Sequence, residues 1–300
     1  MAKHFSENER RICGYFKKDI IFKYNGTEYI VLENAAKPTC DRGEPKTDIY
    51  VSTQNRLTGY NKAFKISYKQ DNADFIENKT SAERAEKLLG PDWQGIIIES
   101  TSRLKSEFDR RTLIYKEKFG RTDKGAITLG WKFEILRVKS GELSNKLQLT
   151  ENQKHDIYAG INLPDSKRNA TVNGKIISNS GVADYIFEEV TEAKDAQDVI
   201  DGLKTIDEYL AIYPDLYFSC KALNYRTFRK KYDGNRPLSV FVDWKVKDGK
   251  LDYQLVYNRP LTTKGDEVFK RLEFALNELG VENTDNLTDD MVANKDIIYE

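Results

Sequence analysis

Three polar residues lie on two neighbouring stretches that the sequence predicts to be β-strands. The segment GEPKTDIYVS, residues 43–52, begins its strand at Asp48, and the segment AFKISYKQ, residues 63–70, carries Ser67 and Lys69. Side chains two residues apart on a strand point to the same face, so Ser67 and Lys69 lie together. If the two strands pair as a hairpin, Asp48 reaches the same pocket. A carboxylate beside a lysine can hold a divalent cation and position a water molecule at a phosphodiester.

These residues also have an ordinary structural explanation. An Asp that follows a turn is common turn chemistry, and a Lys that ends a strand protects a sheet edge. The alternation of the second strand favours a site, because Lys65, Ser67 and Lys69 all lie on its polar face. We therefore keep both interpretations and follow the functional one.

The arrangement resembles the PD-(D/E)XK nuclease superfamily, which includes many restriction endonucleases. Pro45 and Asp48 stand for the PD pair of that family, slightly stretched, and Ser67-Tyr68-Lys69 stands for its (D/E)XK tripeptide. Asp48 lies 21 residues before Lys69, a spacing that the family tolerates. The resemblance covers residues 33–90. It implies a mixed α+β (α/β) fold in which helices flank a central mixed sheet.

The resemblance also implies roles for the three residues. Asp48 would bind Mg²⁺ or Mn²⁺, Lys69 would position the attacking water and stabilise charge, and Ser67 would support them through a hydrogen bond. Ser67 replaces the second acid of the motif, and a hydroxyl is a poor ligand for a hard cation. Some members of the superfamily carry Gln, Asn or Ser at this position, so the change does not exclude activity.

A second carboxylate must then complete the metal site. Glu33, at the end of the predicted strand 27–34, and Glu44, in the following turn, are the first candidates. Glu7 and Glu9, on a predicted first helix over residues 6–18, are weaker ones. If no carboxylate reaches the site, the same fold could serve as a non-catalytic DNA-binding module.

Basic residues are concentrated in two segments, although the formal net charge is zero. Eight basic residues face four acidic ones between residues 103 and 124, where we expect a basic helix over 102–119. Six basic residues and one acidic residue lie between residues 221 and 236. Such segments suit the phosphate backbone of duplex DNA, although solvated helix faces are the commoner explanation of a single charged run. The candidate DNA contacts are Arg103, Lys105, Arg110, Arg111, Arg226, Arg229 and Lys230.

Composition excludes several other classes of protein. Of the 300 residues, 39% are apolar and 32% are charged, and no window is apolar enough for a membrane span. The N-terminus has no apolar core of a secretory signal, and three cysteines make no disulfide framework, so we expect a cytoplasmic protein. Two histidines are too few for a zinc hydrolase or a Ser-His-Asp enzyme. Phosphate-binding glycine motifs are absent from the sequence.

The remaining pattern predicts further strands and helices. We expect a buried strand at 95–100 (GIIIES), a long strand at 127–139, a capped helix at 150–160 and a helix at 196–210. A hairpin spans 240–257 and a closing helix spans 266–279. Two domain organisations are open. The chain divides into a nuclease-like core over 1–125 and an accessory or recognition region over 126–300, or it forms one continuous domain.

A second function comes from a different class. The segment 184–215 holds ten acidic residues against two lysines and could dock another protein, which would make the chain a non-catalytic binding or structural protein. Symmetric cutting of duplex DNA would instead favour a homodimer. Loss of DNA affinity with rising salt separates a nuclease from a protein-docking module.

Overall fold

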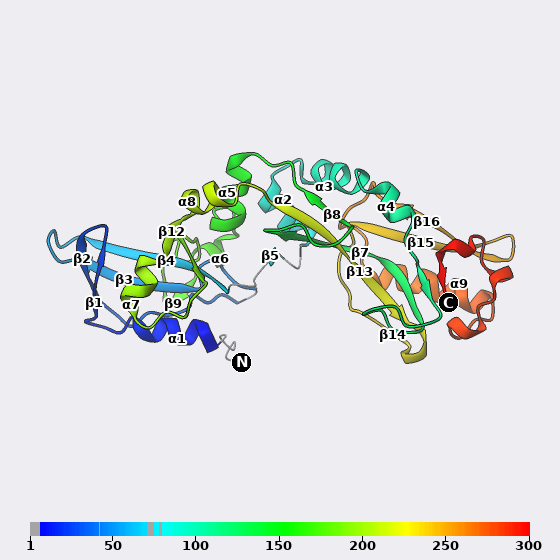
Figure 1. The fold of residues 1–300 in the computed structure, drawn as a ribbon, viewed down its shortest axis with the longest axis horizontal. Helices are drawn as coiled ribbons and strands as arrows, with labels where there is room; N and C mark the ends of the chain where they lie inside the picture. Colours follow the sequence, from blue (N-terminus) through cyan, green and yellow to red (C-terminus); the bar gives the residue numbers. More distant parts are fainter. Residues whose placement is uncertain (1–6, 42, 71–74, 78–79) are drawn as a thin grey trace. The chain divides into compact units, whose positions relative to one another are not determined.

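The computed structural model describes residues 7–41, 43–70, 75–77 and 80–300. The chain forms two compact units, each built from two stretches of sequence (Figure 1). Unit 1 comprises residues 1–74 and 149–214, and unit 2 comprises residues 75–148 and 215–300. Helices and mixed sheets are both abundant, so the predicted α+β fold class is confirmed.

The division differs from the expected boundary near residue 125. Residues 75–125 belong to unit 2, and residues 149–214 return to unit 1. The sequence carries no linker signal at these crossings because regular structure lies close to them. Strand β4 ends at Gln70, shortly before the first crossing, and helix α5 begins at Glu151, shortly after the second.

A six-stranded sheet forms the centre of unit 1, in the order β1-β2-β3-β4-β11-β12. Strands β1 to β4 form an antiparallel meander, whereas β11 is parallel to β4 and β12 is antiparallel to β11. The sheet is therefore mixed. Its strands are β1 (Ile21–Tyr24), β2 (Thr27–Val31), β3 (Ile49–Asn55), β4 (Asn61–Gln70), β11 (Tyr185–Glu189) and β12 (Leu203–Thr205).

Helices cover both faces of this sheet (Figure 1). Ile12 of α1 and Val199 of α7 are buried in one apolar cluster with Ile49 of β3 and Ile66 of β4. Helices α5 and α8 contact one another on the opposite face. The remaining elements of unit 1 are α1 (Glu7–Tyr15), α5 (Glu151–Ala159), α6 (Asp165–Arg168), β9 (Thr171–Val172), β10 (Lys175–Ile176), α7 (Ala196–Asp201) and α8 (Ile206–Ile212).

The predicted single helix over residues 196–210 is wrong. Helix α7 ends before Gly202, the chain forms β12 against β11, and α8 then begins. Thr205 starts the second helix, because its hydroxyl accepts a hydrogen bond from the amide of Glu208 while the Glu208 side chain bonds back. This capping box stabilises a new helix start within a segment whose apolar spacing predicts a single helix.

A nine-stranded sheet forms the centre of unit 2, with the path β14-β13-β7-β15-β16. The strands β5 and β6 pair with β7, β8 pairs with β13, and β17 pairs with β6. The central strands approach closely at Gly130, where a Cβ atom would lie 2.6 Å from the carbonyl oxygen of Val240. The strands are β5 (Phe75–Glu77), β6 (Ile114–Tyr115), β7 (Ala126–Leu136), β8 (Ser144–Lys146), β13 (Tyr217–Arg226), β14 (Lys231–Tyr232), β15 (Val240–Lys247), β16 (Lys250–Val256) and β17 (Ile298–Tyr299).

Two predictions for the helices of unit 2 are wrong. The run GIIIES lies inside α3 and not in a strand, since a short apolar run has the same pattern in a buried helix and a buried strand. The basic helix expected over 102–119 reduces to the five residues of α4, followed by β6, which pairs with β7 and β17. The helices are α2 (Ala82–Leu89), α3 (Trp93–Ser102), α4 (Lys105–Asp109) and α9 (Gly265–Glu278), with 3₁₀ turns at Thr227–Arg229, Thr284–Asn286, Asp289–Met291 and Lys295–Ile297.

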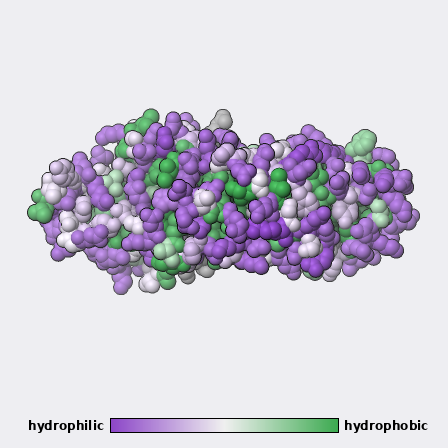
Figure 2. Space-filling model, turned by 90° about the horizontal axis from the view of Figure 1, so that it is seen from above, coloured by the Kyte–Doolittle hydropathy of each residue, from purple (hydrophilic) through white to green (hydrophobic). Residues whose placement is uncertain are grey.

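Several other predictions are confirmed. The β15–β16 hairpin turns at Asp248 and Gly249, both with positive φ, and α9 matches the closing helix. Hydrophilic residues predominate on the face seen in Figure 2, in keeping with the high charged fraction. Large exposed hydrophobic side chains include Leu57, between β3 and β4, Ile176 in β10 and Phe274 in α9.

Candidate active site

Asp48 directly precedes β3 and is fixed against β4. Its amide donates a hydrogen bond to the carbonyl oxygen of Ile66 at 2.9 Å. Its carboxylate Oδ2 accepts hydrogen bonds from the amide of Tyr68 at 2.8 Å and from the hydroxyl of Ser67 at 3.4 Å. The two strands are antiparallel neighbours, so the hairpin pairing on which the site depends is present.

Lys69 lies two residues beyond Ser67 and shares its face of β4. Burial raises the pKa of Asp48, while the positive charge of Lys69 and the hydrogen bond from the Tyr68 amide act in the opposite direction without cancelling it. The structure thus brings together Asp48, Ser67 and Lys69. The surroundings therefore make the ionised form of this carboxylate less favourable than it is in water.

Helix α1 places a second carboxylate, that of Glu9, within electrostatic range of Asp48. The Glu9 carboxylate forms an ion pair with Lys37 Nζ at 2.8 Å. Only 16% of the Glu9 side chain and 12% of the Lys37 side chain are exposed. Both charges act on Asp48: Glu9 raises its pKa and Lys37 lowers it. Glu9, one of the weaker candidates from the sequence, is therefore the acid that the fold places in electrostatic range of Asp48.

No sequence pattern pointed to Lys37. It follows the predicted strand 27–34 in an irregular segment, and only the packing of that segment against α1 brings it to Glu9. Cys13, one turn further along α1, lies in the same surroundings. Burial and the carboxylates of Glu9 and Asp48 raise its pKa to about 12, so its thiol stays protonated.

The donors at this site fit a hard divalent cation. Mg²⁺ keeps several waters and binds through one or two carboxylates together with a substrate phosphate. Asp48 and Glu9 offer that number, and a cation would favour the ionised form of Asp48. Among the residues that the structure describes, no group of three or more His, Cys, Asp or Glu side chains is arranged to hold a metal ion.

The structure places the other two candidate carboxylates elsewhere. Glu33 is exposed, and its carboxylate contacts the amide of Asn173 and the ammonium of Lys175, each at 3.4 Å. These contacts belong to the β9–β10 hairpin, and they lower the pKa of Glu33. Glu44 is exposed in its turn and acts on the charge of Lys37. Through Lys37, the charge of Glu44 is therefore coupled to the candidate site, whereas that of Glu33 is engaged by the β9–β10 hairpin.

A tight polar network lies on the opposite face of the sheet. Glu189 receives two hydrogen bonds from the Arg11 guanidinium at 2.6 and 2.7 Å and one from the hydroxyl of Tyr68 at 2.5 Å. Burial alone would raise the pKa of Glu189, but these donors outweigh it and lower the pKa. The network ties α1, which carries Glu9, to β4 and β11.

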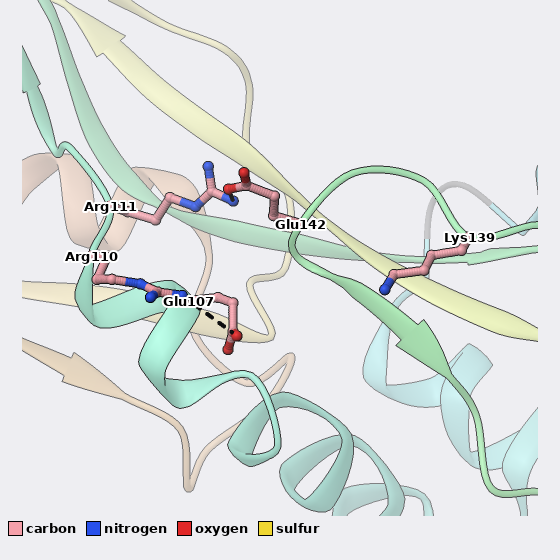
Figure 3. A pocket seen from close by; sticks show the side chains of 5 residues that line it. All are labelled: Glu107, Arg110, Arg111, Lys139 and Glu142. Atoms are coloured by element: carbon pink, nitrogen blue, oxygen red, sulfur yellow. Dashed lines mark hydrogen bonds and ion pairs between the residues drawn. The ribbon is translucent and has the colours of Figure 1, made fainter.

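Four of the expected DNA contacts lie around α4 in unit 2. Arg103, Lys105 and Arg110 are exposed, whereas Arg111 is half-buried and pairs with Glu142 at 2.7 Å. Figure 3 shows Arg110, paired with Glu107, and Arg111 beside a pocket of about 530 Å³ that Lys139 faces from the loop after β7. Three cations thus meet two carboxylates there.

The other three expected contacts lie at the end of β13. Arg226 pairs with Asp123 at 3.4 Å and with Asp233 at 2.9 Å, and Arg229 also reaches Asp123 at 3.7 Å. Lys230 is exposed and has a positive φ of 48°. Part of this positive charge is already neutralised by neighbouring carboxylates.

The acidic segment 184–215 has several structural uses. Asp184 pairs with Lys65 at 3.1 Å, and Glu189 binds Arg11. Asp195 caps α7 through the amide of Asp198. These acids are distributed over β11, α7 and α8, so the segment contains several local interactions in addition to its exposed charge.

Comparison of the chain with protein-family models, with curated proteins and with solved structures gives no match. Within the described part of the chain, no helix is long and apolar enough to cross a membrane.

Proposed function

We propose that unit 1 is a divalent-cation-dependent deoxyribonuclease that hydrolyses phosphodiester bonds in DNA. The observation that carries the proposal is the gathering of Asp48, Lys69 and Glu9 at one end of a mixed sheet, around a carboxylate whose pKa burial raises. Perturbed carboxylates beside a lysine are typical of catalytic sites. A mixed sheet with helices on both faces is also the architecture that the PD-(D/E)XK resemblance implies.

Each side chain has a distinct role in the proposed reaction. Asp48 and Glu9 hold Mg²⁺ or Mn²⁺, which when bound supplies Lewis-acid polarisation of the phosphate and an acidified water. Lys69 positions the attacking water and offsets the charge that develops on the phosphoryl oxygens. The hydroxyl of Ser67 orients the Asp48 carboxylate, and Lys37 balances the charge of Glu9.

DNA is the proposed substrate because exposed cations of unit 2 suit a phosphate backbone. The exposed side chains of Arg103, Lys105 and Lys230 form no ion pair with another described residue. We propose them as backbone contacts, together with Arg110, Arg111, Arg226 and Arg229. A homodimer would allow both strands of a duplex to be cut, and a cytoplasmic setting suits the three cysteines, which form no disulfide in the described part of the chain.

The test is cleavage of supercoiled and linear duplex DNA in the presence of Mg²⁺ or Mn²⁺. We compare the native chain with Asp48→Asn and Lys69→Met, and with Lys175→Met as a matched control, since Lys175 is an exposed lysine of the same unit. The two site variants should lose at least about a hundredfold in rate, the order of loss when one charge-stabilising group is removed. The control should cut like the native chain.

Three other outcomes would reject the proposal. Equal cleavage by all four proteins would place the chemistry elsewhere. Salt-sensitive DNA binding without cleavage would favour the non-catalytic DNA-binding alternative, in which Ser67 marks a silent site. Absence of both cleavage and binding would favour a protein-docking function.

A further inference from the structure

A pocket of unit 1 lies on the face of the sheet that carries Lys65, Ser67 and Lys69. Its cavity volume is about 410 Å³, and its wall includes Lys65 of β4. Side chains alternate along a strand, so Lys65 points to the same side as Ser67 and Lys69. Helices α5 and α8 supply other parts of the wall through His155 and Ile206. The pocket therefore continues along the strand that carries the candidate active site.

Basic side chains line this pocket from three elements. The ammonium of Lys65 lies 3.1 Å from the carboxylate of Asp184, and only 16% of the Lys65 side chain is exposed. Arg168, at the end of α6, pairs with the largely exposed Asp165 at 2.6 Å. The Nε of Arg168 is buried and has no hydrogen-bond partner. His155 adds an imidazole from α5. The guanidinium of Arg168 also lines the pocket, where its positive charge attracts an anionic group.

The rest of the wall combines apolar surface with polar edges. Ile161, Val182 and Ile206 provide apolar side chains, and Asn179 and Thr205 provide groups that donate and accept hydrogen bonds. Carboxylates at the rim can accept from amino groups. A flat heterocycle with amino and carbonyl edges, joined to a phosphate, matches this combination. The volume lies within the range of about 300–1,000 Å³ usual for small-ligand pockets.

We propose that this pocket binds one nucleotide of the DNA strand that is cut, with its base against the apolar wall and its phosphate at Arg168 and Lys65. The identity of the ligand rests on the proposed nuclease function. Lys65 and Ser67 are about 7 Å apart along the strand. The bound nucleotide therefore lies close to the scissile phosphate on the cut strand.

Calorimetric titration of the full chain with deoxyadenosine 5′-monophosphate, in the absence of metal, tests the proposal. The variants are Arg168→Ala and Lys65→Met. The matched control is Arg56→Ala, because Arg56 is an exposed arginine of the same unit that also has one ion pair, with Glu28 at 2.7 Å. Circular dichroism checks that each variant is folded.

The two pocket variants should bind the nucleotide about tenfold more weakly, since each loses a charge-assisted contact. Arg56→Ala should bind like the native chain, and so should Lys69→Met, because its lysine belongs to the neighbouring site. Deoxyadenosine, which lacks the phosphate, should bind weakly and equally to the native chain and to Arg168→Ala. No binding by the native chain, or equal binding by Arg168→Ala and Arg56→Ala, would overturn the proposal.

Cleavage kinetics separate this inference from the nuclease proposal. If DNA is cut, Arg168→Ala should raise KM while kcat stays unchanged, and an unchanged KM would reject the pocket while the nuclease stands. If DNA is not cut but nucleotide binding still depends on Arg168, the pocket stands and the nuclease fails. Loss of nucleotide binding in Lys69→Met alone would place the nucleotide at the active site and reject the pocket.

Discussion

Two carboxylates of unit 1 lie on opposite faces of one sheet and have opposite pKa shifts. Glu189 is surrounded by donors from Arg11 and Tyr68, and its pKa is lowered. Asp48 is half-buried with less compensation, and its pKa is raised. The backbone of Tyr68 donates to Asp48 and the side chain of Tyr68 donates to Glu189, so a single residue contacts both.

The difference separates a structural carboxylate from a functional one. The charge of Glu189 is matched by its own neighbours, and the network connects α1 to the sheet. Asp48 lacks a comparable match, so its ionised form costs stability in the folded protein. A carboxylate whose ionisation carries such a cost, and that lies within electrostatic range of Lys69 and Glu9, suits a role in binding a cation.

Cleavage should show the largest contrast between the two carboxylates. Asp48→Asn should lose at least about a hundredfold in the rate of DNA cleavage, because it removes a proposed metal ligand. Glu189→Gln keeps a hydrogen-bond acceptor and should stay within a few-fold of the native rate. Single-turnover assays on one DNA fragment measure both. Equal losses would mean that the two carboxylates do not differ in function.

For the free energy of unfolding, the larger loss should come from substitution of Glu189. Glu189→Ala should lower the free energy of unfolding by about 2 kcal/mol, since it removes charge-assisted hydrogen bonds to a half-buried arginine. Glu192→Ala is the matched control, because Glu192 is largely exposed and lies 3.8 Å from the same Arg11. The control should change stability by less than about 0.5 kcal/mol. Urea denaturation followed by circular dichroism gives both values.

The pH dependence of stability should have opposite signs for the two positions. The lowered pKa of Glu189 stabilises the fold above the ordinary value of 4.5, and this contribution is lost as the pH falls through the folded-state pKa. The raised pKa of Asp48 acts the other way: stability is lost as the pH rises from 3.8 through the folded-state value. Asp48→Asn should therefore be more stable than the native chain at neutral pH, and Glu189→Gln less stable.

Melting curves at pH 3 to 7 would measure these differences. A gain for Asp48→Asn that shrinks towards acid pH supports the assignment. A loss of stability in Asp48→Asn at neutral pH would show that neighbouring groups compensate the negative charge of Asp48 in the native chain.

A smaller effect is expected at Lys37. Its ammonium pairs with Glu9 and lowers the pKa of Asp48, so it competes with a cation for the same two carboxylates. Lys37→Met should bind Mn²⁺ severalfold more tightly than the native chain, whereas Lys175→Met should not differ from it. Calorimetric titration measures both affinities. Weaker binding in Lys37→Met would instead assign Lys37 to holding Glu9 in position.

The sequence was sufficient for the local part of the candidate site. Alternation of apolar and polar residues predicted the strand that carries Ser67 and Lys69, and the turn chemistry placed Asp48 at the start of its neighbour. Antiparallel pairing of adjacent strands then brings the three residues together, as the register shows. Both the alternation along a strand and the pairing of adjacent strands can be recognised in a short stretch of sequence.

The non-local part of the site could not be read from the sequence. Glu9 reaches Asp48 only because α1 packs on the sheet, and Lys37 only because an irregular segment packs on α1. Glu33 was a reasonable candidate by sequence distance, yet the β9–β10 hairpin, about 140 residues away, engages it. The crossings between the units escape prediction for the same reason, since they depend on contacts between distant segments.

The most direct measurement is Mn²⁺ binding by electron paramagnetic resonance at neutral pH, for the native chain, Asp48→Asn and Glu189→Gln. We predict that the native chain and Glu189→Gln bind the ion and that Asp48→Asn loses this binding. Equal binding by all three proteins would contradict the assignment of Asp48 as the functional carboxylate.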